Sequence, residues 1–164
     1  MCISLSNPPK FAVDSMLGTI SKKLRILGYD STFSSDIEDE KLLNNTRDEN
    51  RIIITKDVEL TKKAEKLLVD FILLTKNDEV EQFNEIKSFL NIDSFLVSPE
   101  KSRCTTCNGV LKIAQKESVT GIVEPNVIKF TNKFWECILC KKIFWNGSHI
   151  KNLQAFFQQV NSLT

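Results

Sequence analysis

Four of the five cysteines in the chain form two C-x-x-C pairs: Cys104 with Cys107, and Cys137 with Cys140. Four thiolates complete the tetrahedral coordination of Zn²⁺ and leave no open position, so a zinc ion held here would be structural. In a reducing compartment such pairs indicate metal ligands, with a redox or disulfide role as the alternative. Cys2 has no such partner and is expected to be a free thiol.

Carboxylates stand where predicted strands end. One aspartate directly follows each of two predicted strands, and an acidic segment opens the helix after a third. Hard divalent cations such as Mg²⁺ or Mn²⁺ prefer carboxylate oxygens, and two of them together can promote hydrolysis of a phosphodiester. The candidate ligands for these cations are Asp14, Asp36, Asp39, Glu40 and Asp57.

The same carboxylates have a purely structural interpretation. Asp14 and Asp57 both stand where an N-cap residue would begin a helix, and residues 36–40 would form a solvated first turn. A receiver domain of the flavodoxin type also places acidic residues at this edge of its sheet. The residue types and spacings alone therefore leave capping and cation binding both open.

The elements that must position these residues alternate between strand and helix. Predicted strands cover residues 11–13, 29–33, 51–54 and 71–74. The first predicted helix covers residues 16–27, the second begins at residue 36, the third ends at about residue 68, and the fourth runs from about 78 to 90. Gly28 ends the first helix. Such alternation predicts parallel crossovers and a three-layer α/β sandwich, whose binding crevice lies at the carboxyl ends of the strands.

The chain changes character from Ser98 and Pro99 onward. The paired cysteines all fall within residues 98–148, and the long gap between the pairs leaves room for a β-hairpin. Short β-like runs are predicted at residues 110–113 and 127–130, followed by a closing amphipathic helix over residues 150–160. We therefore divide the chain into an α/β domain, residues 1–97, and a zinc ribbon with a C-terminal helix, residues 98–164.

The charge is unevenly distributed, although the net charge is only +1. Residues 1–98 contain 13 basic and 17 acidic residues, whereas residues 99–164 contain 9 and 4. An acidic N-terminal part would suit the binding of cations, and a basic C-terminal part would suit contact with phosphate.

Basic and aromatic residues alternate beside the second cysteine pair, as they do on surfaces that bind single-stranded nucleic acid. The candidates for nucleic-acid binding are Lys141, Lys142, Trp145 and His149, the only histidine in the chain. A small ribbon also needs core residues, so Trp145 and the nearby Trp135 have packing as their alternative role. The histidine has a packed or solvated position as its alternative.

No stretch approaches the ~20 apolar residues of a membrane span, and the first residues lack the apolar run of a signal peptide. We therefore expect a cytoplasmic protein with no membrane partner. Formation of a homodimer is left open.

Several segments together resemble a known family. The stretch F-A-V-D-S-M-L-G, continuing to L-R-I-L-G-Y-D, is similar to the opening of the PIN-like ribonuclease domains of the Mut-seven C-terminal family. The later D-E-K-L-L, R-I-I-I-T-K-D, S-R-C-T-T-C-N, C-I-L-C-K-K-I-F-W and N-G-S-H continue the resemblance, which spans about Phe11 to Phe157.

This resemblance implies a PIN-like three-layer sandwich with an attached zinc ribbon, and metal-dependent cleavage of RNA. Asp14, Asp39 and Asp57 match the metal-binding, catalytic aspartates of the family, with Asp36 and Glu40 as further candidates. Two alternatives remain. The same fold could act as a non-catalytic module that binds RNA or a ribosomal particle, or as a DNA nuclease, because nothing in the sequence reads the 2′-hydroxyl.

Overall fold

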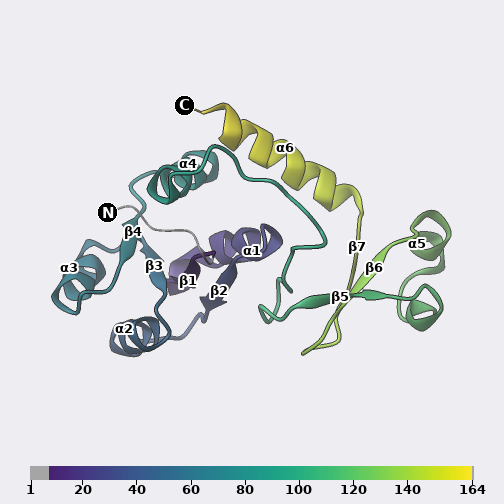
Figure 1. The fold of residues 1–164 in the computed structure, drawn as a ribbon, viewed down its shortest axis with the longest axis horizontal. Coiled ribbons are helices and arrows are strands. Elements are labelled where there is room, and N and C mark those ends of the chain that lie inside the picture. The colour runs from purple at the N-terminus through teal and green to yellow at the C-terminus, as the bar shows by residue number, and fades with distance from the viewer. Residues whose placement is uncertain (1–7, 164) are drawn as a thin grey trace.

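The structure, a computed structural model, describes residues 8–163, so Cys2 and its expected free thiol lie outside the described residues. The first part of the chain forms a parallel four-stranded sheet with strand order β2-β1-β3-β4 (Figure 1). Its strands are β1 (Lys10–Val13), β2 (Asp30–Phe33), β3 (Ile52–Thr55) and β4 (Phe71–Leu73).

Helices cover both faces of this sheet and connect its strands. They are a 3₁₀ turn, η1 (Ser15–Leu17), and the helices α1 (Gly18–Ile26), α2 (Asp39–Asp48), α3 (Val58–Lys66) and α4 (Glu79–Leu90). Each parallel step from strand to strand needs such a crossover, as the alternating pattern predicted.

Alternating strand residues supply two separate cores. Phe11 and Val13 of β1 pack with α1 and α4, whereas Ala12 between them packs with α2 and α3. In β3 every side chain is buried, as expected of a central strand covered on both faces. The predicted three-layer α/β sandwich is therefore confirmed.

The C-terminal helix α6 (Ser148–Ser162) returns to this sandwich and packs against α4 (Figure 1). Its Phe157 and Val160 are buried in the same core as β1. The buried Lys87 of α4 donates from Nζ to the carbonyl oxygens of Val160 at 3.2 Å and Leu163 at 2.7 Å, which satisfies the end of α6. The division of the chain at residue 98 remains a proposal, because α6 completes the core of the first part.

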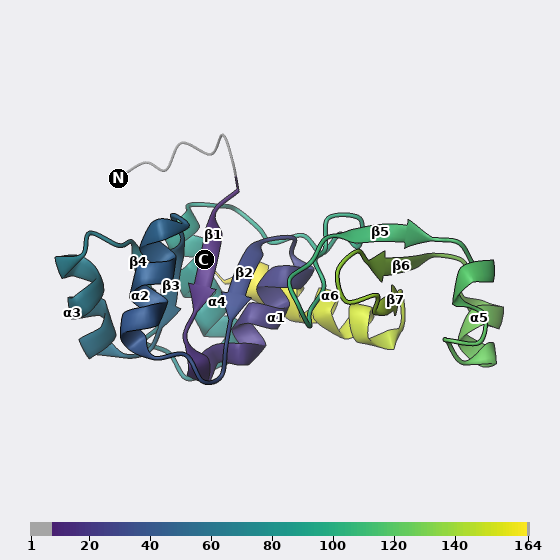
Figure 2. The same ribbon diagram turned by 90° about the horizontal axis from the view of Figure 1, so that it is seen from below.

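The ribbon is a separate antiparallel sheet that extends away from the sandwich (Figure 2). Its strands, in spatial order, are β5 (Leu111–Ala114), β6 (Phe134–Cys137) and β7 (Ile143–Trp145). At its far end a 3₁₀ turn, η2 (Glu117–Val119), and the helix α5 (Pro125–Phe130) enclose a small core built on Val119, Val123 and Phe134.

The predicted β-like run at residues 127–130 is wrong, because these residues belong to α5. Pro125 occupies the first turn of that helix, where its fixed φ and missing N–H favour a helix start. Val127 and Ile128 then pack side by side against the small core of the ribbon. Val127 and Ile128 are thus the residues by which this short helix contacts the ribbon core, while Phe130 remains exposed.

Gly28 ends α1 with a φ of +95°, and the start of the ribbon segment covers this helix end. The amide of Arg103 donates to the carbonyl oxygen of Arg25 at 2.7 Å. A Cβ atom on Gly28 would lie 2.7 Å from the carbonyl oxygen of Lys101. Gly28 therefore permits both the left-handed turn and the close approach of the ribbon.

We predict that Gly28→Ala destabilises the fold more than Gly121→Ala. Both glycines have positive φ, but a Cβ on Gly121 would have no neighbour within 4 Å. The control should lose about 1 kcal/mol of unfolding free energy through backbone strain alone. Gly28→Ala should lose at least about 2 kcal/mol, because the backbone of Lys101 must also move. Urea unfolding of both variants measures the difference, and equal losses would contradict the proposed contact.

Candidate active site and metal centre

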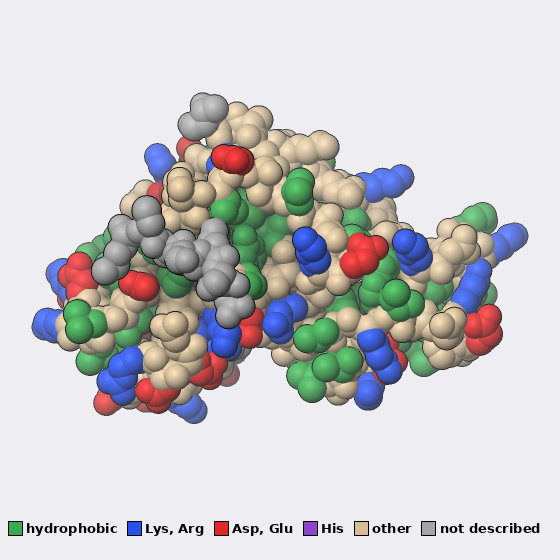
Figure 3. Space-filling view, in the orientation of Figure 1, with side chains coloured by type: hydrophobic (Ala, Val, Ile, Leu, Met, Phe, Trp, Pro, Cys, Tyr) green, Lys and Arg blue, Asp and Glu red, His purple; other side chains and the backbone are tan. Residues whose placement is uncertain are grey.

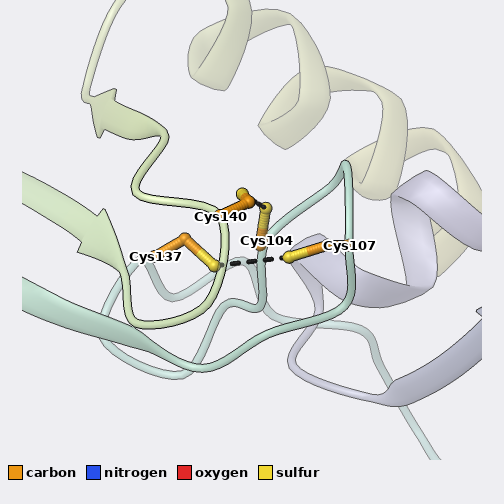
Figure 4. Close-up of side chains that lie close together, drawn as sticks. All are labelled: Cys104, Cys107, Cys137 and Cys140. Atoms are coloured by element: carbon orange, nitrogen blue, oxygen red, sulfur yellow. Dashed lines mark hydrogen bonds between the residues drawn. The ribbon is translucent and has the colours of Figure 1, made fainter.

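The four paired cysteines meet at one point between the ribbon and the sandwich (Figure 4). All four Sγ atoms lie within 4.8 Å of one another, and all four cysteines are free. The shortest distances, 3.5 Å and 3.4 Å, join thiols of different pairs: Cys104 to Cys140, and Cys107 to Cys137. The structure thus brings together the whole set that the sequence predicted.

Each pair belongs to a turn of the same local shape. In the first turn the amide of Asn108 donates to the carbonyl oxygen of Cys104 at 2.8 Å, and in the second Lys141 donates to Cys137 at 3.1 Å. Asn108 and Lys141 each follow the last cysteine of their pair and adopt left-handed φ values of 64° and 62°. We call these turns the first and second knuckle. Two equivalent knuckles present four thiols to one centre, as a closed tetrahedral site requires.

The chemistry of this donor set fits zinc. The amide of Lys142 lowers the pKa of the Cys140 thiol, but burial and the three neighbouring thiols raise it to about 12. Four sulfur atoms this close cannot all ionise unless a cation balances them. Burial lowers the pKa of the nearby Arg25, and negative charge on Cys104 and Cys107 would raise it. The thiols would therefore hold a structural zinc ion as thiolates.

We expect one equivalent of zinc per chain, because the four thiols supply a complete ligand set. Elemental analysis of protein purified without chelator should find it. Cys137→Ser should lose the zinc and lower the melting temperature, since metal binding contributes directly to folding. Cys2→Ser, which changes a cysteine outside both pairs, is the matched control and should keep the zinc. A zinc content near zero in the unmodified protein would rule out the site.

At the carboxyl ends of the strands, Asp14 is held by the neighbouring strand. The amide of Asp14 donates to the carbonyl oxygen of Ile54 at 3.0 Å, and its Oδ2 accepts from Thr55 Oγ1 at 2.6 Å. Its side chain makes no capping hydrogen bond to the turn that follows. The structure therefore disfavours the capping interpretation of Asp14.

Thr55 also connects Asp14 to the second aspartate of this edge. The amide of Asp57 donates to Thr55 Oγ1 at 2.9 Å, so the hydroxyl joins the two aspartates. Thr55 is fully buried, and the sequence reasoning missed it. In the sequence, Thr55 could have been noticed as a hydroxyl residue at the end of an otherwise apolar strand, two residues before Asp57.

Asp57 does cap a helix, as the structural interpretation proposed. Its Oδ1 accepts from the amides of Glu59 at 2.7 Å and Leu60 at 3.4 Å at the start of α3. Both bonds use the same oxygen atom. Capping therefore does not require Oδ2 of Asp57, and the two roles are compatible.

Asp39 begins α2 and is paired with a lysine of α3, since its Oδ2 lies 2.8 Å from Lys63 Nζ. The hydrogen bond and the charge of Asp39 raise the pKa of Lys63, and the charge of Asp57 adds to this effect. Asp36 accepts a hydrogen bond from the neighbouring Ser35 at 3.2 Å, and Glu40 lies in the exposed first turn of α2.

Within the described residues, no three carboxylates gather as closely as the four thiols. Hydrogen bonds through Thr55 connect Asp14 to Asp57. Asp39 is connected to Asp57 only through Lys63, whose pKa the charges of both aspartates raise. The oxygen donors at this edge suit a hard divalent cation in kind. Oδ2 of Asp39 is paired with Lys63 in this arrangement.

The predicted RNA-binding residues lie on the ribbon and at the start of α6. Lys141, Lys142 and His149 are exposed, whereas Trp145 is partly buried against the ribbon core. Figure 3 shows lysine and arginine side chains distributed over the ribbon side of the molecule. Trp135 is only 4 % exposed, so the packing role proposed for it is confirmed.

A family model described as Mut7-C RNAse domain matches residues 9–157. The chain belongs to this family. The match runs through both the sheet and the ribbon, so the family membership covers the thiols and the aspartates together. No significant match was found among curated proteins or solved structures. The membership confirms the resemblance in the sequence and supports a ribonuclease-type function.

None of the helices in residues 8–163 combines the length and the apolar character needed to cross a membrane.

Proposed function

We propose that this chain is a metal-dependent ribonuclease that hydrolyses phosphodiester bonds of RNA at the carboxyl edge of its parallel sheet. The observation that carries the proposal is the hydrogen-bonded series from Asp14 through Thr55 to Asp57, at the ends of adjacent strands, in a member of a ribonuclease family. A buried hydroxyl that holds the Asp14 carboxylate and also accepts from the backbone amide of Asp57 is more than capping requires. It places oxygen donors where open α/β sheets bind ligands.

Asp14, Asp39 and Asp57 would hold one or two Mg²⁺ or Mn²⁺ ions, with Asp36 and Glu40 as additional ligands. Such ions supply an activated water and stabilise the leaving oxygen of a phosphodiester. Thr55 holds Oδ2 of Asp14 in place, and the capping bonds of Asp57 fix its carboxylate while leaving Oδ2 for a cation. Lys63 neutralises Asp39 until a cation replaces it.

The ribbon would position the RNA. A structural zinc ion holds its two knuckles, and Lys141, Lys142, Trp145 and His149 offer positive charge and aromatic or imidazole faces to a single strand. Residues 99–164 carry a net charge of +5, from 9 basic and 4 acidic residues, which supports this division of labour.

One observation favours a second candidate function. Asp39 is occupied by Lys63, and the three aspartates do not converge as the thiols do within the described part of the chain. If the ion pair between Asp39 and Lys63 is permanent, Asp39 cannot help to bind a cation. The chain would then be a non-catalytic module that binds RNA or a ribosomal particle. An assay with added metal separates the two functions, and parallel single-stranded DNA substrates test the DNA nuclease alternative.

We predict that Asp14→Asn and Asp57→Asn each abolish Mn²⁺-dependent cleavage of single-stranded RNA, because each removes a charged ligand. Asparagine caps a helix as well as aspartate does, so Asp57→Asn should retain its melting temperature. Asp48→Asn, at the opposite end of α2 from Asp39, is the matched control and should cleave normally.

Gel analysis of end-labelled RNA with and without Mn²⁺ measures this effect. Full cleavage by either variant would show that its carboxylate does not act in catalysis. Loss of cleavage accompanied by a large fall in melting temperature would assign the aspartate a structural role instead.

We predict that Lys141→Ala combined with Lys142→Ala weakens RNA binding and flattens its salt dependence by about one to two units of slope. The maximal cleavage rate should change little, because these lysines hold substrate and transition state alike. Lys62→Ala with Lys66→Ala removes the same charge from exposed positions of α3 and should leave the slope unchanged.

Binding is measured by fluorescence anisotropy of a labelled RNA over a series of salt concentrations. A normal slope with reduced turnover in the ribbon variant would place the ribbon in the active site, and His149 would be the next residue to replace.

A further inference from the structure

A pocket of about 120 Å³ lies where the ribbon meets the end of α1 and the start of α6. Trp135 and Phe144, which pair across β6 and β7, form one side of it, and Ile26 and Ile150 form part of the other. None of these side chains belongs to the zinc centre or to the carboxyl edge. The pocket is therefore a separate feature of the molecule.

The size and walls of the pocket suit one aromatic ring. An engineered apolar cavity of about 150 Å³ holds a benzene molecule, so about 120 Å³ open to one side accommodates a single six-membered ring. The rings of Trp135, Phe144 and Trp145 supply the surfaces on which a planar ligand stacks. A fused two-ring ligand is larger than this volume and would project from the open side.

The polar groups around the pocket indicate what kind of ring it accepts. Trp135 is 4 % exposed, and its indole Nε1 is buried with no hydrogen-bond partner among the described residues. This nitrogen has no exposed surface, so the polar partners open to a ligand are other lining side chains, among them Thr105 and Asn146. Hydroxyl and amide groups can donate to the carbonyl oxygens of a ring.

Positive charge surrounds the same pocket. Arg103 lines it and is held by a 2.9 Å hydrogen bond from Nη1 to the carbonyl oxygen of Asn108. The exposed His149 stands at its border, and Lys142 Nζ lies 5.8 Å from the ring centroid of Phe144. Arg103 Nη2 also lies 3.9 Å from Asp30 Oδ2, and Lys142 Nζ donates to Thr106 Oγ1 at 3.1 Å. Cations beside an aromatic slot can contact the phosphates that flank a base in a nucleic-acid strand.

We propose that this pocket receives one unstacked pyrimidine base of the RNA strand, which rests on RNA being the substrate as proposed above. The base stacks against Phe144, and its carbonyl oxygens face the polar side chains of Thr105 and Asn146. Arg103 and Lys142 contact the adjoining phosphates. Because α1 runs back from the carboxyl edge and the pocket lies at its end, the base is held away from the bond that is cut.

The chain provides its own reporter of this binding event. It contains only two tryptophans, Trp135 and Trp145, and both line the pocket. Tetrauridylate added without Mg²⁺ or Mn²⁺ should change the tryptophan emission in a saturable manner. An abasic tetranucleotide with the same phosphates should not, because it offers no ring. An equal response to both probes would overturn the proposal, since phosphate alone would explain it.

Two matched variants locate the effect. Phe144→Leu keeps an apolar side chain but removes the stacking ring, and should weaken tetrauridylate binding about ten-fold. Phe130→Leu makes the same change at a 79 % exposed position at the far end of the ribbon, and should bind normally. Equal zinc content in both variants shows that the ribbon is folded. Unchanged affinity in Phe144→Leu would refute the pocket, and equally tight binding of tetraadenylate would refute the size limit.

These measurements do not depend on cleavage. Emission changes confined to base-containing probes, in a protein that cleaves no RNA, would support the pocket and contradict the ribonuclease function. Mn²⁺-dependent cleavage with no emission change would support the ribonuclease and contradict the pocket.

Discussion

The hydrogen bonds that join the first knuckle to the end of α1 and the start of β2 are the interaction on which the arrangement of the whole chain depends. Arg25 Nη1 donates to the carbonyl oxygen of Thr105 at 2.8 Å, and Asn108 Oδ1 accepts from the amide of Ser31 at 3.0 Å. Asn108 Nδ2 donates to Asp30 Oδ1 at 2.8 Å. Burial lowers the pKa of Arg25, so its charge is tolerated only while these partners are present. The cysteine cluster is therefore connected directly to an edge strand of the parallel sheet.

This docking also decides where chemistry and binding can occur. It fixes the ribbon near the amino end of β2, whereas Asp14 and Asp57 follow the carboxyl ends of β1 and β3. Four-residue strands separate the two edges by about 13 Å. A ribbon at that distance could orient a strand of RNA, but its side chains could not join the aspartates in binding a cation. The basic charge of residues 99–164 is consistent with this positioning role.

Most elements of the fold could be predicted from local patterns in the sequence. The features that could not be predicted depend on contacts between residues far apart in the chain. The buried run of β3 and the left-handed Gly28 each depend on neighbours in sequence, so both could be predicted. The packing of α6 into the first core and the pairing of Lys63 with Asp39 join residues far apart in the chain, which periodicity does not encode. The strand predicted within α5 failed because the four residues V-I-K-F are too few to show a helical period.

The two knuckles show how one residue turns a metal motif into a docking site. Both need a left-handed residue after the last cysteine, and Asn108 and Lys141 fill that position. Asparagine tolerates this conformation and also carries both a donor and an acceptor, which Asn108 uses on Asp30 and the adjacent amide. Lysine offers no acceptor, so the second knuckle makes no equivalent bond and keeps Lys141 at the surface. The difference between C-T-T-C-N and C-I-L-C-K thus determines which knuckle holds the sheet and which one faces the RNA proposed here.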